Sequence, residues 1–346
     1  TNMKAVVLDD SRNNSVVIKD IPTPTIGDGD ILVKMHACGL CGSDIEKVYG
    51  RYGVVSKRLG HEPAGEVVAV GSRVKDIRVG DRVFVHHHVP CYSCYYCNHG
   101  DYTMCEHYQR SNIEPCGLAE LFLVPEWNVK RGGVIVLPEH VSYDEAAMIE
   151  PLACCIKAFK KAGIKANESV AILGVGPAGI MHVMLAKHLN AEPIIAIDIN
   201  EFRLNFARSL GASMVLNARD DDINANVKAI TEGRGVDTAI VATGSINALQ
   251  SALSIVRRGG RVLLFGVPPK GSSMQMDLNH LFNNEIKIIP SLAASDYDTK
   301  EAFELIASKS IDIAKIITHR FDLDHAMEAI ECAHRADNAM KVIVVS

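Results

Sequence analysis

The chain has 346 residues, of which 48% are apolar and 22% are charged, and its formal net charge is −5. This length predicts two domains, and the composition is that of a globular protein in water. Proteins that bind phosphate backbones usually carry a basic excess or a long basic run, so the charge disfavours a nucleic-acid-binding function.

Residues 3 to about 150 are rich in short valine-containing segments broken by glycine turns. KAVVLDD, ILVKMHACG and GEVVAVGSRV alternate apolar with polar residues, as does VGDRVFVHH. This period of two is typical of half-buried strands and predicts a β-barrel-like domain. The N-terminal residues lack the pattern of a signal peptide, which favours a reducing compartment, the cytoplasm.

A cysteine-rich stretch interrupts these strands at residues 90–106. Its spacing is C-x2-C-x2-C-x7-C, made by Cys91, Cys94, Cys97 and Cys105. In a reducing compartment, thiolates at this spacing favour tetrahedral zinc over disulfides. A DNA-binding zinc module is disfavoured, because the chain is acidic and no basic helix adjoins the cysteines.

From about residue 151, strands and helices alternate. The predicted strands are SVAILGVG, PIIAIDIN, SMVLNA, DTAIVATG, RVLLFGV and EIKIIPSL, with helices expected at 177–190, 201–212, 221–232 and 246–260. Nearly continuous apolar strands in this order predict a doubly wound parallel sheet. The apolar stretch 169–186 is long enough to span a membrane, but its glycines, proline and histidine disfavour a span.

A glycine motif follows the first of these strands and opens the next helix. Its residues are Gly174, Gly176, Pro177 and Gly179. Glycines there let a dinucleotide pyrophosphate approach the helix N-terminus. Asp198 ends the next strand, where a carboxylate accepts hydrogen bonds from a ribose 2′-hydroxyl and repels a 2′-phosphate. NAD is therefore favoured over NADP, a preference that nearby Arg203 weakens unless it is a solvated helix charge.

Three metal-binding residue types occur in the first domain, namely Cys41 in CGLCGSDIE and His61-Glu62 in GHEPAGEVVAVGSRV. Thiolate, imidazole and carboxylate are all plausible zinc ligands. The signature G-H-E-x2-G-x5-G-x2-V is complete here and is followed by Gly80-Asp81. With the cysteine loop and the glycine motif, the chain resembles the zinc-dependent medium-chain alcohol and polyol dehydrogenases. IEPL at 149–152 and ASKSIDIAKIITHRF at 307–321 are most similar to the sorbitol dehydrogenase branch.

The resemblance implies a GroES-like β-barrel catalytic domain, residues 1–152 and 294–346, and a Rossmann domain, residues 153–293. It implies two zinc ions per chain, one structural in the cysteine lobe and one catalytic. Cys41 and His61 match ligands of the catalytic zinc, and Glu62 is a direct ligand in some members. Glu150 stands where other members have a ligating cysteine, and the resemblance leaves open whether it binds zinc directly or through water. A homo-oligomer is implied, with a tetramer favoured over a dimer.

The implied reaction oxidises a secondary hydroxyl of a polyol, sugar or cyclitol, with hydride passing to NAD. By resemblance, Ser43 takes the alcohol proton, Asp44 orients His61, and Glu46 replaces the histidine that often completes the relay. Ser291 replaces a substrate-binding arginine of sorbitol dehydrogenases. His86–His88 are interpreted as strand-end histidines near the zinc lobe rather than a third metal site. The alternatives are L-threonine 3-dehydrogenase and a catalytically inactive zinc-holding structural or regulatory protein. The expected partner is a small alcohol or ketone; neither nucleic acid nor a membrane is expected.

Overall fold

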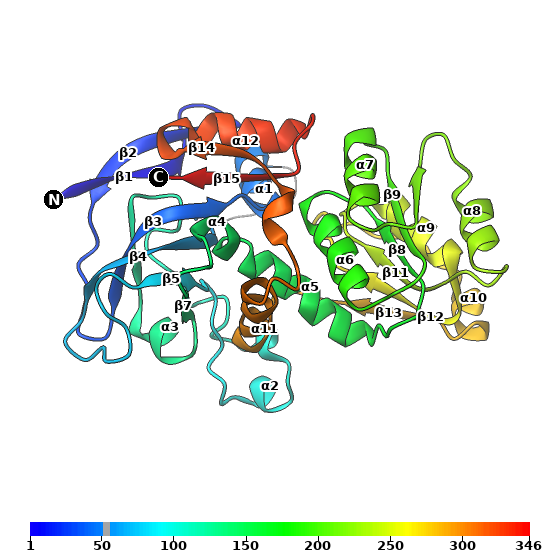
Figure 1. Ribbon diagram of the computed structural model, residues 1–346, viewed down its shortest axis with the longest axis horizontal. Helices are drawn as coiled ribbons and strands as arrows, with labels where there is room; N and C mark the ends of the chain where they lie inside the picture. Colours follow the sequence, from blue (N-terminus) through cyan, green and yellow to red (C-terminus); the bar gives the residue numbers. More distant parts are fainter. Residues whose placement is uncertain (51–55) are drawn as a thin grey trace. The chain divides into compact units, whose positions relative to one another are not determined.

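The computed structural model describes residues 1–50 and 56–346, which divide into two compact units. Unit 1 comprises Thr1–Ala153 and Ala293–Ser346, and unit 2 comprises Cys154–Leu292 (Figure 1). Helix α5 (Ile149–Ala162) carries the chain from unit 1 into unit 2. Both chain ends belong to unit 1. The sequence predicts that a loop near residues 46–57 helps to shape the substrate pocket; residues 46–49 belong to helix α1 (Gly42–Tyr49), and residues 51–55 lie outside the described residues.

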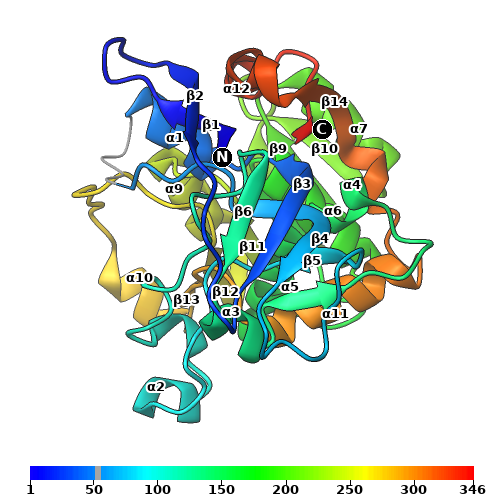
Figure 2. The same cartoon turned by 90° about the vertical axis from the view of Figure 1, so that its left-hand side faces the viewer.

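Unit 1 is mainly antiparallel β structure. Within the described residues it holds a two-stranded sheet, β1–β2, and a seven-stranded sheet in the order β14-β15-β3-β4-β5-β7, with β6 paired to β3. Figure 2 shows β6, β3, β4 and β5 side by side. The strands are β1 (Asn2–Leu8), β2 (Val16–Pro22), β3 (Ile31–Gly39), β4 (Glu62–Val70), β5 (Arg82–Val85), β6 (Leu121–Val124), β7 (Val134–Val136), β14 (Ile317–Asp322) and β15 (Lys341–Val345).

Strand β3 shows why these segments form a sheet. Ile31, Val33 and Met35 are fully buried, whereas Lys34 between them is exposed. Successive side chains of a strand point to opposite faces, so this alternation buries one face and leaves the other polar. The strands predicted around 4–10, 31–39 and 65–74 are confirmed as β1, β3 and β4.

The helices of unit 1 are short and connect or cover the strands. They are α1 (Gly42–Tyr49), α2 (Tyr95–Asn98), α3 (Glu126–Lys130), α4 (Tyr143–Ala146), α11 (Asp296–Ala307) and α12 (Ala326–Arg335), with 3-10 turns η1 (Tyr102–Met104), η2 (Ile313–Ile316) and η3 (Leu323–His325). The apolar pattern of KEAFELIASK (300–309) predicts a helix and that of MKVIVV (340–345) a strand; they form part of α11 and of β15, and both belong to unit 1.

Unit 2 is the predicted doubly wound α/β domain. Its described strands form one parallel sheet in the order β10-β9-β8-β11-β12-β13. The strands are β8 (Val170–Leu173), β9 (Ile194–Asp198), β10 (Met214–Asn217), β11 (Val236–Val241), β12 (Val256–Leu264) and β13 (Lys287–Pro290). The helices are α6 (Pro177–His188), α7 (Glu201–Ser209), α8 (Ile223–Ile230), α9 (Ile246–Ile255) and α10 (Leu278–Asn283). The strand order reverses between β8 and β11, where such sheets bind ligands.

Two details of unit 2 differ from or refine the sequence-based predictions. The helix expected over 246–260 ends at Ile255, and the next residues belong to β12. The helix ends there because Val256 is extended, with φ −76° and ψ 141°. The apolar stretch 169–186 forms β8, a turn and most of α6. In the part of the chain that the structure describes, every helix is too short or too polar to cross a bilayer.

Helix α6 carries a histidine in apolar surroundings. His182 is fully buried, with its ring stacked at 5.5 Å on Phe159 and edge-on at 4.5 Å to Phe265. Neither ring nitrogen has a hydrogen-bond partner among the described residues. Burial lowers the pKa of His182 to about 3. The folded state therefore holds a neutral imidazole, whereas in the unfolded chain the ring takes up a proton near pH 6.5.

This histidine predicts acid sensitivity of unit 2. Below about pH 6.5 the unfolded chain binds a proton that the folded state excludes, so stability should fall by about 1.4 kcal/mol per pH unit until the pH approaches 3. His182→Leu should remove this loss in urea unfolding compared at pH 7 and pH 5. His188→Gln, on the exposed side of α6, is the control. An equal loss in His182→Leu and the parent would contradict the prediction.

Candidate metal centres and cofactor site

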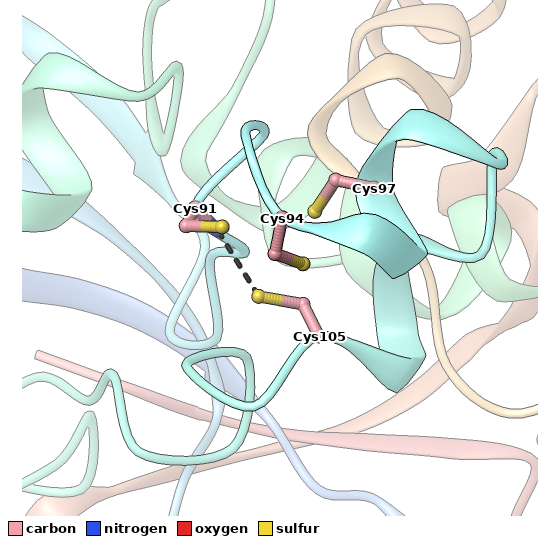
Figure 3. Close-up of side chains that lie close together, drawn as sticks. All are labelled: Cys91, Cys94, Cys97 and Cys105. Atoms are coloured by element: carbon pink, nitrogen blue, oxygen red, sulfur yellow. Dashed lines mark hydrogen bonds between the residues drawn. The ribbon is translucent and has the colours of Figure 1, made fainter.

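The four cysteines of the predicted lobe converge in unit 1. They lie between β5 and β6, on α2, η1 and the turns around them, and their Sγ atoms all lie within 4.8 Å of one another. Figure 3 shows the four side chains pointing toward a common centre. The backbone N–H of Cys91 donates to Cys105 Sγ at 3.3 Å. Four sulfurs so arranged fit a tetrahedral structural zinc site.

The thiols of the lobe differ in acidity. Burial opposes ionisation of Cys91, but hydrogen bonds from Ser93 outweigh it and lower the pKa of Cys91 to about 6. Burial and the neighbouring sulfur of Cys94 raise the pKa of Cys97 to about 12. By themselves the four thiols therefore do not all ionise near neutral pH. A bound cation would hold them as thiolates, which again fits zinc.

The lobe is tied to the rest of unit 1 through buried polar contacts. Tyr92, between the first two cysteines, donates to the carboxylate of Asp296 at the start of α11. The other oxygen of that carboxylate lies 2.9 Å from Nδ1 of His86, which is fully buried. Tyr108 donates to the carbonyl of Ala294 at 2.9 Å. The lobe therefore holds the segment that leads into α11.

The three consecutive histidines after β5 have three different environments. His86 pairs with Asp296, as described above. His88 donates from Nδ1 to the carbonyl of Ser111 at 2.7 Å. His87 contacts other imidazoles: its ring centroid lies 4.9 Å from that of His61 and 3.8 Å from that of His88. Among the described residues these histidines complete no further metal cluster.

A second group of donors lies where β3 and β4 pair. Antiparallel pairing sets Gly39 opposite Glu62, which brings the residues after β3 beside those before β4. As a result, donor atoms of Cys41, His61 and Glu62 lie within 4.8 Å of one another. Cys41 is the N-cap of α1, so the thiol lies at the positive end of that helix.

Asp44 is a buried carboxylate that contacts the residues of this centre. It is fully buried and accepts from the backbone N–H of Cys41 and of Gly60, both at 3.0 Å. Its Oδ1 lies 3.7 Å from Nδ1 of His61. Burial opposes the charge, but His61 outweighs it and lowers the pKa of Asp44 to about 2. An ionised carboxylate therefore lies within ion-pair distance of Nδ1 of His61.

Two carboxylates complete the surroundings of His61. Glu150, in the first turn of α5, is buried and places Oε2 at 3.9 Å from Nε2 of His61. Glu62 is fully buried, and its Oε2 accepts from Nζ of Lys341 at 2.7 Å. Sequence reasoning did not single out Lys341. The available signal was a lone charge opening the otherwise apolar strand KVIVV.

The predicted proton-relay residues lie on α1. Ser43 and Glu46 are both half-buried and three residues apart, so they share one side of the helix. Between them Asp44 and Ile45 are buried toward the core. Because Cys41 is the N-cap of the same helix, Ser43 and Glu46 follow it within the first two turns.

The glycine motif has the backbone that a dinucleotide fingerprint requires. Gly174 adopts a φ of +90°, and a Cβ on Gly179 would lie 1.8 Å from the carbonyl oxygen of Gly174. Pro177 opens α6. Asp198 accepts from the N–H of Val175 at 2.8 Å, so it braces the glycine turn as well as ending β9.

Arg203 is not the solvated helix charge that sequence reasoning allowed. It is half-buried, and its guanidinium lies against the turn, where a Cβ on Gly176 would be 3.1 Å from Nη1. Its Nε is buried without a partner among the described residues. Burial lowers the pKa of Arg203, and the carboxylate of Asp198 opposes this only in part. A cation therefore lies at the predicted phosphate-binding turn.

These contacts predict how Asp198 affects cofactor choice. Asp198→Ala should narrow the NAD to NADP ratio of kcat/KM by on the order of tenfold, because it removes a ribose acceptor and a charge that repels a 2′-phosphate. Arg203→Ala should act in the opposite direction. Both ratios come from initial rates with each cofactor. An unchanged ratio in Asp198→Ala would identify another residue as the selector.

Two protein-family models match this chain. The alcohol dehydrogenase GroES-like domain matches residues 27–134, and the zinc-binding dehydrogenase model matches residues 177–308. Sorbitol dehydrogenase of Bacillus subtilis (strain 168) is 36% identical, over 99% of this chain and 97% of that protein. L-threonine 3-dehydrogenase of Yersinia pestis (strain Pestoides F) is 28% identical over 94% of each. The structure of a zinc-binding dehydrogenase from Sinorhizobium meliloti 1021 bound to NADP is 29% identical in sequence, with a TM-score of 0.87 over 100% of both chains.

The thiol, imidazole and carboxylate donors of unit 1, with the glycine turn of unit 2, define a zinc-binding nicotinamide-dependent dehydrogenase. The family models and the full-length similarity lead to the same class. The chain belongs to the zinc-dependent medium-chain alcohol and polyol dehydrogenase family, near its sorbitol dehydrogenase branch. The predicted GroES-like and Rossmann folds and the expected cofactors, Zn²⁺ and NAD(H), are confirmed.

Proposed function

We propose that this protein is an NAD-dependent zinc dehydrogenase that oxidises a secondary hydroxyl of a polyol, sugar or cyclitol to the ketone, reversibly. The observation that carries the proposal is the convergence of Cys41, His61 and Glu62, whose donor atoms lie within 4.8 Å of one another. Similarity to sorbitol dehydrogenase over the whole chain supports the substrate class.

The residues of this centre fit a metal ion. Glu62 Oε1 is buried, and no described residue donates a hydrogen bond to it, so it lacks the partner that a buried carboxylate oxygen requires. Thiolate, imidazole and carboxylate form a donor set of catalytic zinc. We assign Cys41, His61 and Glu62 as ligands of this zinc, with Glu150 bound to it through water, and the four lobe cysteines as ligands of a structural zinc. When bound, zinc supplies a Lewis acid that makes a hydroxyl more acidic, and NAD supplies a hydride acceptor.

The remaining roles belong to side chains on α1. Asp44 holds His61 in one orientation through Nδ1. We assign Ser43 as the first acceptor of the substrate hydroxyl proton and Glu46 as the base that passes it to solvent. Their half-buried positions on one side of α1 support this relay, because a proton leaving a closed site needs successive groups within reach.

We assign dinucleotide binding to residues 153–293 and catalysis to residues 1–152 with 294–346. The cofactor-binding residues are Gly174, Gly176, Pro177, Gly179, Asp198 and Arg203. The glycine turn would receive the pyrophosphate, and Asp198 the adenosine ribose. Arg203 beside the turn supplies a positive charge for a phosphate group. NAD is the preferred cofactor, because Asp198 places a negative charge where NADP carries its 2′-phosphate.

We further infer a homo-oligomer, with a tetramer favoured over a dimer, in the cytoplasm. Leu278 and Phe282 on α10 are 69% and 81% exposed, and this helix leads into β13, which ends the described parallel sheet. An apolar surface beside an open strand edge suits a second copy of the chain. None of the ten cysteines forms a disulfide, as in a reducing compartment. Sedimentation equilibrium giving the mass of one chain would contradict the oligomer, and cell fractionation tests the compartment.

L-threonine 3-dehydrogenase is the second candidate. The Yersinia pestis protein of that name is similar over 94% of this chain. The arginine that sorbitol dehydrogenases direct at substrate is replaced here by Ser291, a buried residue whose Oγ has no hydrogen-bond partner among the described residues. By the resemblance, a serine at this position removes a substrate contact that sorbitol dehydrogenases make.

The test is a panel of polyols, sugars, cyclitols and threonine with NAD and NADP, followed by absorbance of the reduced nicotinamide. Zinc analysis accompanies it. Fastest turnover on a polyol, sugar or cyclitol with about two zinc per chain supports the proposal. Preference for threonine supports the second candidate. No turnover with one zinc per chain would identify a structural or regulatory zinc protein instead.

A further inference from the structure

A lysine buried inside unit 1 has no role in the reaction as assigned so far. Lys341 opens β15 and is 2% exposed. Its Nζ donates to Oε2 of Glu62 at 2.7 Å and to the carbonyl of Leu40 at 2.9 Å. A buried ammonium is costly unless it is paired and hydrogen-bonded, and here both conditions are met. These two contacts connect it to Glu62, at the start of β4, and to Leu40, the residue before Cys41.

The fold makes room for this pair. Strands β15, β3 and β4 lie in succession, and Gly39 of β3 faces Glu62 on one side and Ile343 on the other. A Cβ at position 39 would lie 2.1 Å from Oε2 of Glu62 and 3.1 Å from Cε of Lys341. Glycine is therefore required here, because any side chain would displace the ion pair.

The two oxygens of Glu62 have different surroundings. Oε2 is held by Lys341, whereas Oε1 is buried and has no hydrogen-bond partner among the described residues. The carboxylate also lies in the cluster with Cys41 and His61. With Oε2 engaged, one oxygen is left for a metal. The ammonium also offsets one of the negative charges around that cluster, which weakens the attraction of Glu62 for a cation.

We propose that Lys341 is a positioning residue that limits Glu62 to a single oxygen at the metal centre, so that a donor position stays available to the substrate hydroxyl. A catalytic zinc site needs such an open position, whereas a site closed by protein ligands is structural. The inference rests on the proposed function, because it takes Cys41 and His61 as ligands. Without Lys341, both oxygens of Glu62 are free to bind the metal and fill that position.

The test uses the cadmium-loaded protein and cadmium NMR. Four-thiolate and mixed-ligand sites differ strongly in shielding, so the lobe and the centre give separate resonances, and the lobe resonance is an internal control. Lys341→Met should move the centre's resonance to higher shielding, since an oxygen donor is added. Chelator competition should show the centre's metal held at least about tenfold more tightly, because a nearby positive charge is lost. Lys341→Arg, which keeps the charge, should resemble the parent.

Two further variants isolate the route through Glu62. Glu62→Gln with Lys341 intact should move the centre's resonance to lower shielding, and in that background Lys341→Met should add no further shift. Lys34→Met, on the exposed side of β3, is the control and should leave both resonances unchanged.

Several outcomes would overturn the proposal. An unchanged centre resonance and metal affinity in Lys341→Met would mean that the lysine only stabilises the fold. If Lys341→Met still shifts the centre's resonance in the Glu62→Gln background, Lys341 acts through its hydrogen bond to Leu40 and not through Glu62. If Lys341→Met does not fold, Glu62→Gln alone still decides, because an unchanged resonance there excludes Glu62 as a ligand. A parent protein with a single cadmium resonance would instead contradict the proposed function.

Discussion

Cys94→Ser is expected to remove the metal of the lobe and to lower the melting temperature by on the order of 10 °C. Metal bound at a structural site contributes folding free energy directly, since the unfolded chain lacks the site. The loss of stability should extend beyond the lobe. Tyr92 donates to Asp296, the first residue of α11, and Tyr108 donates to the carbonyl of Ala294 just before it. Zinc content should fall from about two to about one per chain.

Calorimetry and metal analysis of purified protein test this expectation. Cys332→Ser is the matched control, since that half-buried thiol belongs to no metal cluster in the described part of the chain. The zinc retained by Cys94→Ser should be that of the centre at Cys41 and His61. A variant with parental stability and two zinc per chain would exclude a structural role for the lobe.

Ser43→Ala is expected to lower kcat for alcohol oxidation by at least about a hundredfold. Positioned proton transfer contributes roughly 10²- to 10⁴-fold, and this change removes the first group of the assigned relay. Glu46→Gln should be milder and should depend on pH. Its loss of rate should be greatest below neutral to mildly alkaline pH and should shrink at higher pH, because base in the solvent then accepts the proton directly.

Pre-steady-state rates across this pH range distinguish the two residues. Zinc content should equal that of the parent in both variants, since neither side chain is assigned as a ligand. A profile for Glu46→Gln that overlays the parent's would remove Glu46 from the relay and leave water as the exit. Parental rates in Ser43→Ala would refute the relay itself.

Local patterns in the sequence were sufficient for the architecture and for the chemical groups. Alternation along β3 indicates one buried face, because successive side chains of a strand point to opposite faces. The continuous apolar run VAIL in β8 indicates a strand that is buried on both faces. The lobe cysteines could likewise be assigned to one site, since they lie within sixteen residues and the chain between them is too short to separate them. The glycine motif could also be recognised from the sequence, because its turn needs glycine at fixed positions.

Only the tertiary structure decided which distant groups meet. Lys341 lies 279 residues from Glu62, and their contact depends on the order β15-β3-β4, which no local pattern encodes. Asp296 reaches His86 and Tyr92 in the same way, through the return of the chain to unit 1. Arg203 lies against Gly176 rather than in solvent because α7 packs beside β9. Periodicity and spacing report on neighbours along the chain, whereas ion pairs and buried hydrogen bonds depend on strand order and register, which are set by the packing of the whole domain.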